Sequence, residues 1–293
     1  MTAQECKIFS EESILFCLSE LKSDFMDFDR VISRSELDRM AKTASRIPLA
    51  QSEGDHLVDI GGTIMWLPIY SRLLHYKRIS LVVAPGLFTW SAYGGKFDEM
   101  RLMRDFGCNY VPANVDVTTF GIASGTATCV VCFEVLEHLQ GDPMHVVSEA
   151  NRVLADGGLF YITTPNVLFS ENLVRYYFGG HPFLWAVYTN CYGDRHNREY
   201  TPFELIKLLE AGGFTVDQLE TLTISQYGGL FRLAGMLLSL FPAVTGRVPL
   251  NMRREHSHVR ARRSGPVRER YPTFLYDLFG EKSVMKGVPY EGF

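Results

Sequence analysis

The chain has 293 residues, of which 46% are hydrophobic and 21% charged, and its formal net charge is -4 at pH 7. This composition is ordinary for a globular protein with a sizeable core, and the negative balance argues against a nucleic-acid-binding protein. Six cysteines are too few for a disulfide framework in a chain of this length. The charge is uneven, because residues 247–270 contain eight arginines and only two acidic residues.

The first fifty residues predict a helical segment. Residues 11–44 alternate apolar and charged positions at helical spacing and contain no proline or glycine, so we expect one or two helices ahead of the sheet. The N-terminus lacks a basic start followed by an apolar run, so no signal peptide is expected and a cytoplasmic location is the default.

Strands and helices then alternate. We expect strands at 56–61, 79–84 and 110–115, the last ending at Asp116, with helices at 66–74 and 97–106 between them. A fourth apolar strand at 127–133 contains Cys129 and Cys132. These side chains would point to opposite faces of the sheet, which favours two core cysteines over a redox or metal pair.

Capping signals define the second half. Asp142 precedes Pro143 at the start of a helix, and Thr201 with Glu204 forms a capping box. Further strands are expected at 159–163, 214–222 and 256–263. Such alternation is typical of a parallel α/β sheet covered on both faces, which binds ligands beyond the carboxyl ends of its strands. The polar residues expected at that edge are Glu134, Glu137, His138 and Asn166.

Residues 129–166 carry a family resemblance. The order FEVLEHL, DP, RVL-DGG and TPN resembles the class I S-adenosylmethionine-dependent methyltransferases, in particular the branch that methylates small molecules and glycans. The resemblance implies a Rossmann-like seven-stranded sheet with helices on both faces. It further implies a domain at about 51–270 with lid or acceptor insertions near 167–200 and 226–252, after the helical segment 1–50 and before a tail at 271–293.

S-adenosylmethionine is the implied cofactor. The resemblance assigns it five residues: Asp59, Gly61, Gly62, Asp116 and Glu134. Two features depart from the family pattern. Thr63 and Met65 stand at the later glycine positions, and residues 83–86 lack the carboxylate that usually binds the ribose. The glycine pair is alternatively a plain tight turn, and Asp116 an exposed loop carboxylate.

Methylation of a hydroxyl group requires a base, and His138 is the best-placed candidate, because histidine titrates near neutral pH. Its alternative role is to stabilise the loop. The aromatic-rich segment 166–200 suits a sugar-like acceptor, or else packs a lid. The predicted acceptor-site residues are Asn166, Arg195, His196 and Glu199. The spacings His196–Glu199 and His256–His258 lack further ligands, so no dedicated metal site is predicted.

The apolar stretch 230–241 is too short to span a bilayer. It is expected to be a lid or packing helix, or alternatively to make peripheral membrane contact together with the basic residues up to 263. The sequence thus predicts a methyltransferase, oxygen-directed, acting on a sugar or other small metabolite in glycan or natural-product biosynthesis. The alternative is an inactive methyltransferase-fold protein that serves as a partner or scaffold. The sequence gives neither the acceptor nor the oligomeric state.

Overall fold

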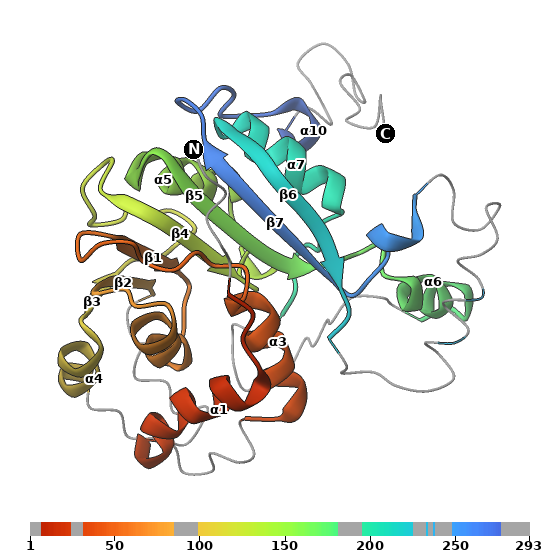
Figure 1. Cartoon of the computed structure of the whole chain (residues 1–293). Helices are drawn as coiled ribbons and strands as arrows, with labels where there is room; N and C mark the ends of the chain where they lie inside the picture. Colours follow the sequence, from red (N-terminus) through yellow and green to blue (C-terminus); the bar gives the residue numbers. More distant parts are fainter. Residues whose placement is uncertain are drawn as a thin grey trace.

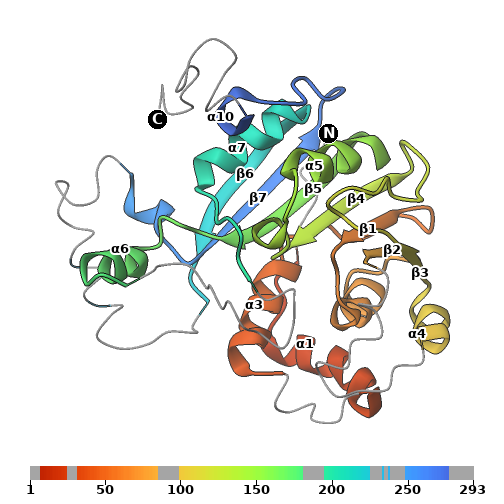
Figure 2. The same ribbon diagram turned by 180° about the vertical axis from the view of Figure 1, so that it is seen from behind.

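A computed structural model describes residues 7–24, 32–84, 99–180, 195–224, 233, 237 and 248–276. These residues build a seven-stranded sheet with helices on both faces (Figures 1 and 2). Its order is β3-β2-β1-β4-β5-β7-β6. The strands are β1 (His56–Ile60), β2 (Arg78–Val83), β3 (Cys108–Pro112), β4 (Ala127–Phe133), β5 (Leu154–Pro165), β6 (Phe214–Leu222) and β7 (His256–Arg263).

The order of the strands fixes where a ligand binds. Strands β1 to β5 are parallel, whereas β7 runs antiparallel to both β5 and β6. From β1 the chain moves outward through β2 to β3, then returns to place β4 on the other side of β1. Ligands of open α/β sheets bind at such a reversal, beyond the carboxyl ends of the strands.

Two apolar clusters cover the faces of the sheet. One holds buried side chains of α1 (Glu11–Leu18), α3 (Arg34–Ala44) and the π-helix η3 (Ile69–Leu73). The other holds α5 (Pro143–Val153) and α7 (Pro202–Ala211). Cys129 lies in the first cluster and Cys132 in the second, which confirms that they face opposite sides. Shorter elements are η1 (Ser19–Asp24), η2 (Ile64–Trp66), α4 (Glu99–Phe106), η5 (Leu136–His138), α6 (Ser170–Tyr177), η6 (Leu250–Met252) and α10 (Thr273–Tyr276).

Both helix starts that the sequence predicts are confirmed. The Asp142 side chain accepts the backbone N–H of Met144, and Pro143 is the first residue of α5. Thr201 accepts the N–H of Glu204, whose carboxylate accepts the N–H of Thr201 in return. These bonds satisfy backbone donors that the first helical turn leaves unpaired.

Three expected elements differ. Strand β3 ends at Pro112 rather than at residue 115, because its register runs from Ile79↔Cys108 to Val83↔Pro112 and thus stops with β2. Asp116 therefore lies in the following loop. The helix expected at 66–74 is broken into η2 and η3. Strand β5 begins at Leu154, which already pairs with Ala127 before a register shift.

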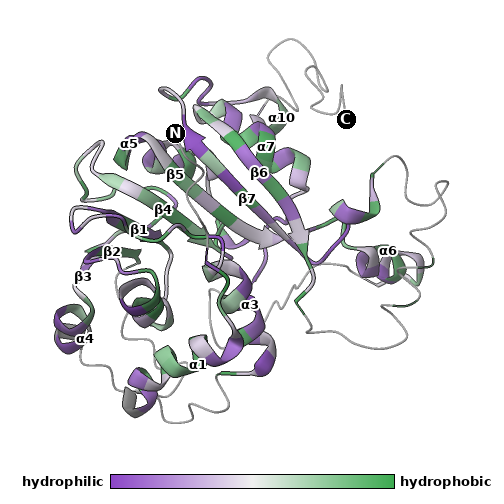
Figure 3. Cartoon of the chain, viewed as in Figure 1, coloured by the Kyte–Doolittle hydropathy of each residue, from purple (hydrophilic) through white to green (hydrophobic). Residues whose placement is uncertain are grey.

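Polarity increases toward one edge of the sheet, since β6 and β7 carry more hydrophilic residues than β4 and β5 (Figure 3). Arginines there pair within the chain: Arg262 lies 2.8 Å from Asp217, and Arg263 pairs with Asp156. Among the described residues, no helix has both the length and the apolar composition needed to cross a bilayer. The stretch 230–241, apart from Leu233 and Leu237, and the tail 277–293 lie outside the described residues.

Candidate functional site

A tight glycine turn follows β1. Gly61 has φ +71°, and its N–H donates to the Val82 carbonyl at 2.8 Å. A Cβ on Gly61 would lie 2.6 Å from Val135, and a Cβ on Gly62 would lie 1.9 Å from the Asp59 carboxylate. Both positions therefore require glycine, and the chain turns sharply against the end of the strand.

Asp59 is buried beneath this turn and 1% exposed. The Tyr70 hydroxyl donates to Asp59 Oδ2 at 2.8 Å. Burial raises the pKa of Asp59 to about 7, and the Tyr70 bond opposes that rise. Asp59 Oδ1 and Thr63 Oγ1 are buried and have no hydrogen-bond partner among the described residues. A polar ligand held against the turn would satisfy such oxygens.

The two departures from the family pattern have structural counterparts. Met65, at a later glycine position, is buried within η2. Strand β2 ends at Val83 and is followed by Ala84, so neither residue offers a carboxylate at the strand end. Residues 85–98 lie outside the described part of the chain.

Asp116 ties two loops together. Its Oδ1 accepts the backbone N–H groups of Gln140 at 3.1 Å and of Gly141 at 2.9 Å. These bonds join the exit of β3 to the loop before α5. Contact between Asp116 and a cofactor stays a prediction beside this structural role.

Glu134 directly follows β4 and has φ +53°, a strained value for a residue other than glycine. Its Oε1 accepts the Thr163 hydroxyl at 2.7 Å, and its Oε2 lies 3.0 Å from His256 Nδ1. Burial alone would raise the pKa of Glu134, but His256 and Arg39 hold it well below its usual range. Burial opposes the charged form of His256, yet Glu134 raises the pKa of this histidine. An ion pair thus closes one side of the carboxyl edge.

Glu137 lies one turn further along, in η5, and is fully buried. Its Oε2 accepts the Thr164 hydroxyl at 3.0 Å, whereas its Oε1 has no hydrogen-bond partner among the described residues. Burial and the charge of Glu134 raise the pKa of Glu137 well above its ordinary value. The pKa values of Glu134 and Glu137, three positions apart, are therefore shifted in opposite directions.

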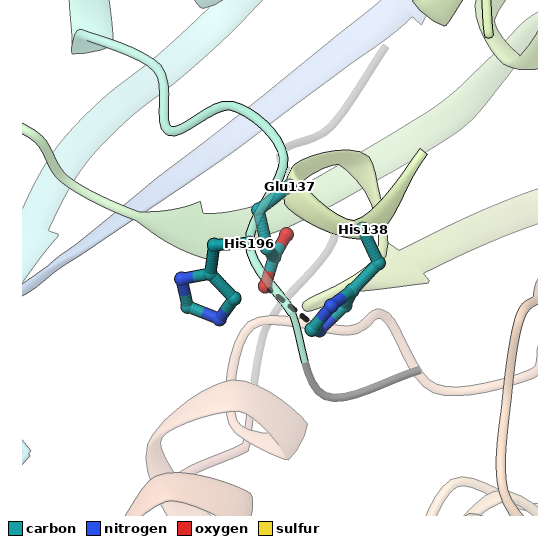
Figure 4. A group of neighbouring side chains, drawn as sticks. All are labelled: Glu137, His138 and His196. Carbon is teal, nitrogen blue, oxygen red and sulfur yellow. Dashed lines mark ion pairs between the residues drawn. The ribbon is translucent and has the colours of Figure 1, made fainter. Parts of the chain in front are cut away.

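Two histidines flank Glu137. His138 Nδ1 lies 3.0 Å from the Arg195 carbonyl oxygen, and His196 Nδ1 lies 2.8 Å from Glu199 Oε1. The ring centroids are 4.9 Å apart. Figure 4 shows the two imidazoles on either side of the Glu137 carboxylate. The fold thus assembles His138, His196, Glu199 and the backbone of Arg195 at one place.

Asn166 has a different environment. Its Nδ2 donates to the carbonyl groups of Met252 at 2.9 Å and Arg254 at 2.7 Å, and its Oδ1 accepts the N–H of Leu168 at 3.0 Å. The amide therefore holds the loop before β7 against the exit of β5. Contact between Asn166 and an acceptor stays a prediction that would require some of these bonds to be exchanged.

The sequence assigned several polar residues of the carboxyl edge to neither the cofactor nor the acceptor. The end of β5 supplies two hydroxyls, β7 a histidine, α3 a cation and η5 a carboxylate. Only the carboxylate, Glu137, had a sequence signal, because it lies in the loop after an apolar strand. The residues concerned are Arg39, Glu137, Thr163, Thr164 and His256.

Known proteins are similar to this chain in sequence. A family described as "Methyltransferase domain" matches residues 34–219. A probable S-adenosylmethionine-dependent methyltransferase of Mycolicibacterium smegmatis is 38% identical over 181 residues, which cover 56% of this chain. The alignment spans 63% of that relative, less than two thirds of its length.

Two solved structures are similar to this chain over most of its length. The [4+2]-cyclase SpnF matches 88% of this chain and 97% of its own, with 14% identity and a TM-score of 0.50. An S-adenosylmethionine-dependent methyltransferase from Mesorhizobium loti matches 79% and 99% of the two chains, with 14% identity and a TM-score of 0.47. The seven-stranded sheet and the likeness to SpnF confirm the predicted fold class. Since the family match covers more than half of the sequence, the chain belongs to this family of methyltransferase domains.

Proposed function

We propose that this protein transfers a methyl group from S-adenosylmethionine to a hydroxyl group of a sugar or other small metabolite in glycan or natural-product assembly. Membership of the family supports the donor and the reaction. The choice of an oxygen acceptor rests on one observation, the anchored imidazole of His138 at the carboxyl edge of the sheet.

The anchoring defines the chemistry of this imidazole. A carbonyl oxygen only accepts hydrogen bonds, so His138 Nδ1 carries the proton that it donates to Arg195. In the neutral ring the lone pair is then on Nε2, and the side chain is 28% exposed. The bond from Nδ1 fixes the orientation of the His138 ring, and Nε2 is the nitrogen that would accept a proton as a general base.

When bound, the cofactor supplies a methyl group already activated by a sulfonium. With the cofactor held by the residues after β1, the acceptor oxygen would take the methyl group, the carbon–sulfur bonding pair would stay on sulfur, and the hydroxyl proton would have to leave. His138 Nε2 takes the hydroxyl proton, which keeps the atoms and charges balanced. The remaining task of the protein is to align the acceptor.

The residues after β1 fit the cofactor. Gly61 and Gly62 let the backbone approach a ligand, and the buried oxygens of Asp59 and Thr63 lack partners that a polar ligand would provide. Asp59, Gly61 and Gly62 would hold the methionine part of the cofactor. Asp116 and Glu134 are proposed to complete the site from the neighbouring loops.

The acceptor is proposed to bind beyond β5. Arg195, His196 and Glu199 lie beside His138 and offer charged and hydrogen-bonding groups. Helix α6 adds large aromatic side chains that are exposed to solvent, which suits stacking against a sugar or planar ligand. They are Tyr176, Tyr177 and the adjoining Phe178.

The alternative, a catalytically inactive partner or scaffold, is favoured by two observations. The buried Met65 stands at a position where the resemblance implies glycine, and Val83 and Ala84 offer no carboxylate for a ribose. A lost hydrogen bond of this kind typically weakens binding by about 1.5–3 kcal/mol. Cofactor affinity therefore separates the two functions.

The test combines calorimetry with a turnover assay. Titration with S-adenosylmethionine and S-adenosylhomocysteine should show binding of both, and methyl transfer is then measured on a panel of sugar and phenolic acceptors. His138→Ala should lower turnover by about 10²–10⁴-fold while the affinity for S-adenosylhomocysteine stays within about twofold of the wild-type value.

His145→Ala is the matched control, because His145 on α5 bonds the Thr118 carbonyl and lies outside the site. It should leave both readouts unchanged. If neither compound binds at millimolar concentration, the proposed methyltransferase activity is overturned and the role as an inactive scaffold is favoured. Unchanged turnover in His138→Ala would exclude this residue as the base.

A further inference from the structure

Glu137, His138 and His196 each offer one ligand atom, and these atoms lie within 4.8 Å of one another (Figure 4). We propose that these three side chains form a binding site for one divalent transition-metal ion, of which Zn²⁺ is the representative probe. Among the described residues, this is the group of histidine, cysteine and acidic side chains whose geometry suits an ion.

The hydrogen bonds behind the two imidazoles support the site. Metal-bound histidines usually donate their second ring nitrogen to a carboxylate or a backbone carbonyl, which fixes the tautomer and the ring. His196 has the first arrangement, with Glu199 at 2.8 Å, and His138 has the second, with the Arg195 carbonyl at 3.0 Å. In both rings Nδ1 makes the supporting bond, so Nε2 is the ligand atom.

The third ligand is a buried oxygen. Glu137 is 0% exposed and its Oε2 is held by Thr164, yet its Oε1 makes no hydrogen bond among the described residues. Its distance to His138 Nε2 is 3.8 Å, too long for a hydrogen bond. Two atoms bound tetrahedrally to one Zn²⁺ at about 2.0–2.2 Å lie roughly 3.3 Å apart, so a small side-chain movement closes the site.

Backbone contacts keep the two ligand-bearing segments together. The N–H groups of Asn197 and Arg198 donate to the Glu137 carbonyl at 2.6 and 3.2 Å, and the Asn197 amide donates to the His138 carbonyl at 2.9 Å. Residues far apart in the sequence are therefore positioned before any ion binds. The sequence predicted no metal site because the spacings His196–Glu199 and His256–His258 show no further ligands. The fold brings Glu137 and His138 to His196.

The donor set indicates the class of ion. Two imidazoles and one carboxylate suit Zn²⁺, Fe²⁺ or Co²⁺, whereas Mg²⁺ and Ca²⁺ prefer oxygen ligands. Three protein ligands leave a coordination position open, as in catalytic rather than structural sites.

Binding of the ion stands independently of the proposed function, but its role in methyl transfer rests on that function. With the ion bound, the His138 lone pair is used for coordination. An acceptor hydroxyl at the open position would then lose its proton to water, because coordination lowers its pKa.

The experiment uses the full chain after removal of metal with a chelator. We expect calorimetry with ZnCl₂ to give one equivalent bound, and Co²⁺ to produce visible absorption bands of a four- or five-coordinate ion. Glu137→Gln and His196→Ala should each weaken binding at least 100-fold, and Glu199→Gln should weaken it by about 10–100-fold.

His145→Ala removes a histidine outside the cluster and should bind Zn²⁺ like the wild type. Unfolding curves of the metal-free variants establish that each is folded. Absence of stoichiometric binding at micromolar Zn²⁺, or equal affinity in all variants, would overturn the proposal. A parallel titration with S-adenosylhomocysteine separates the two ideas, since failure of metal binding with intact cofactor binding removes the metal site alone.

Discussion

Replacing Asp59 by Asn should change how the stability of this protein depends on pH. The carboxyl is buried beneath the glycine turn, and its pKa is raised from 3.8 to about 7. Between these values the native state keeps a proton that the unfolded state has lost, so the free energy of unfolding falls as pH rises. One pKa unit corresponds to about 1.4 kcal/mol, so the total loss between pH 4 and pH 7 is about 4 kcal/mol.

Asparagine has the same shape and does not titrate, so Asp59→Asn removes this loss. The two proteins should differ little in their pH response below pH 4. The variant should then gain up to about 4 kcal/mol relative to the wild type between pH 4 and pH 7, with no further change above. Urea unfolding at pH 4.5, 5.5, 6.5 and 8 measures the difference.

Tyr70→Phe is the companion variant. It removes the hydroxyl whose hydrogen bond lowers the Asp59 pKa. In the Tyr70→Phe background, the stability difference between Asn and Asp at position 59 should therefore level off at a higher pH than in the wild-type background. The argument is refuted if the stability difference between Asp59→Asn and wild type stays constant from pH 4.5 to pH 8. That result would mean that Asp59 is ionised in the native state throughout this range.

Two further substitutions test the packing that supports the site. Gly61→Ala should lose about 2–4 kcal/mol in urea unfolding and weaken binding of S-adenosylhomocysteine, because the added methyl group meets Val135 at a positive φ. Asn151→Ala should lose about 2–4 kcal/mol with unchanged cofactor affinity, since its amide bonds the Gly212 and Gly265 carbonyls at 2.8 and 2.9 Å. A loss below 1 kcal/mol in either variant would contradict the packing argument.

The sequence predicts best those elements whose signals are local. The capping box of Thr201 and Glu204 and the cap of Asp142 are short-range hydrogen-bond patterns, and both helix starts are confirmed. Strands β4, β6 and β7 also have the expected bounds. Strand β3 differs because its length is set by pairing with β2, and that register is a property of the sheet rather than of residues 108–115.

Some residues of the candidate site are recognisable from the local sequence, whereas others are brought together only by the fold. Gly61 and Gly62 are recognisable because their backbone geometry excludes side chains, which restricts the residue type at these positions. The approach of His196 to Glu137 depends instead on backbone hydrogen bonds between segments far apart in the chain. Spacing along the sequence contains no information about such a contact, so the proposed metal site could not be inferred from it.

The two glutamates after β4, Glu134 and Glu137, differ in their surroundings in the folded structure, and this difference separates their roles. Glu134 lies against the Thr163 hydroxyl and against His256, whose pKa it raises, so groups of the protein itself stabilise its charge. Glu137 is fully buried and has one hydroxyl partner, and burial and the charge of Glu134 raise its pKa above the ordinary value. Since the two residues are alike in type and nearly adjacent, only their surroundings distinguish an internal ion pair from a ligand for an external ion. Among the described residues, Glu137 Oε1 lacks a hydrogen-bond partner, and it lies beside His138, the histidine proposed as the base.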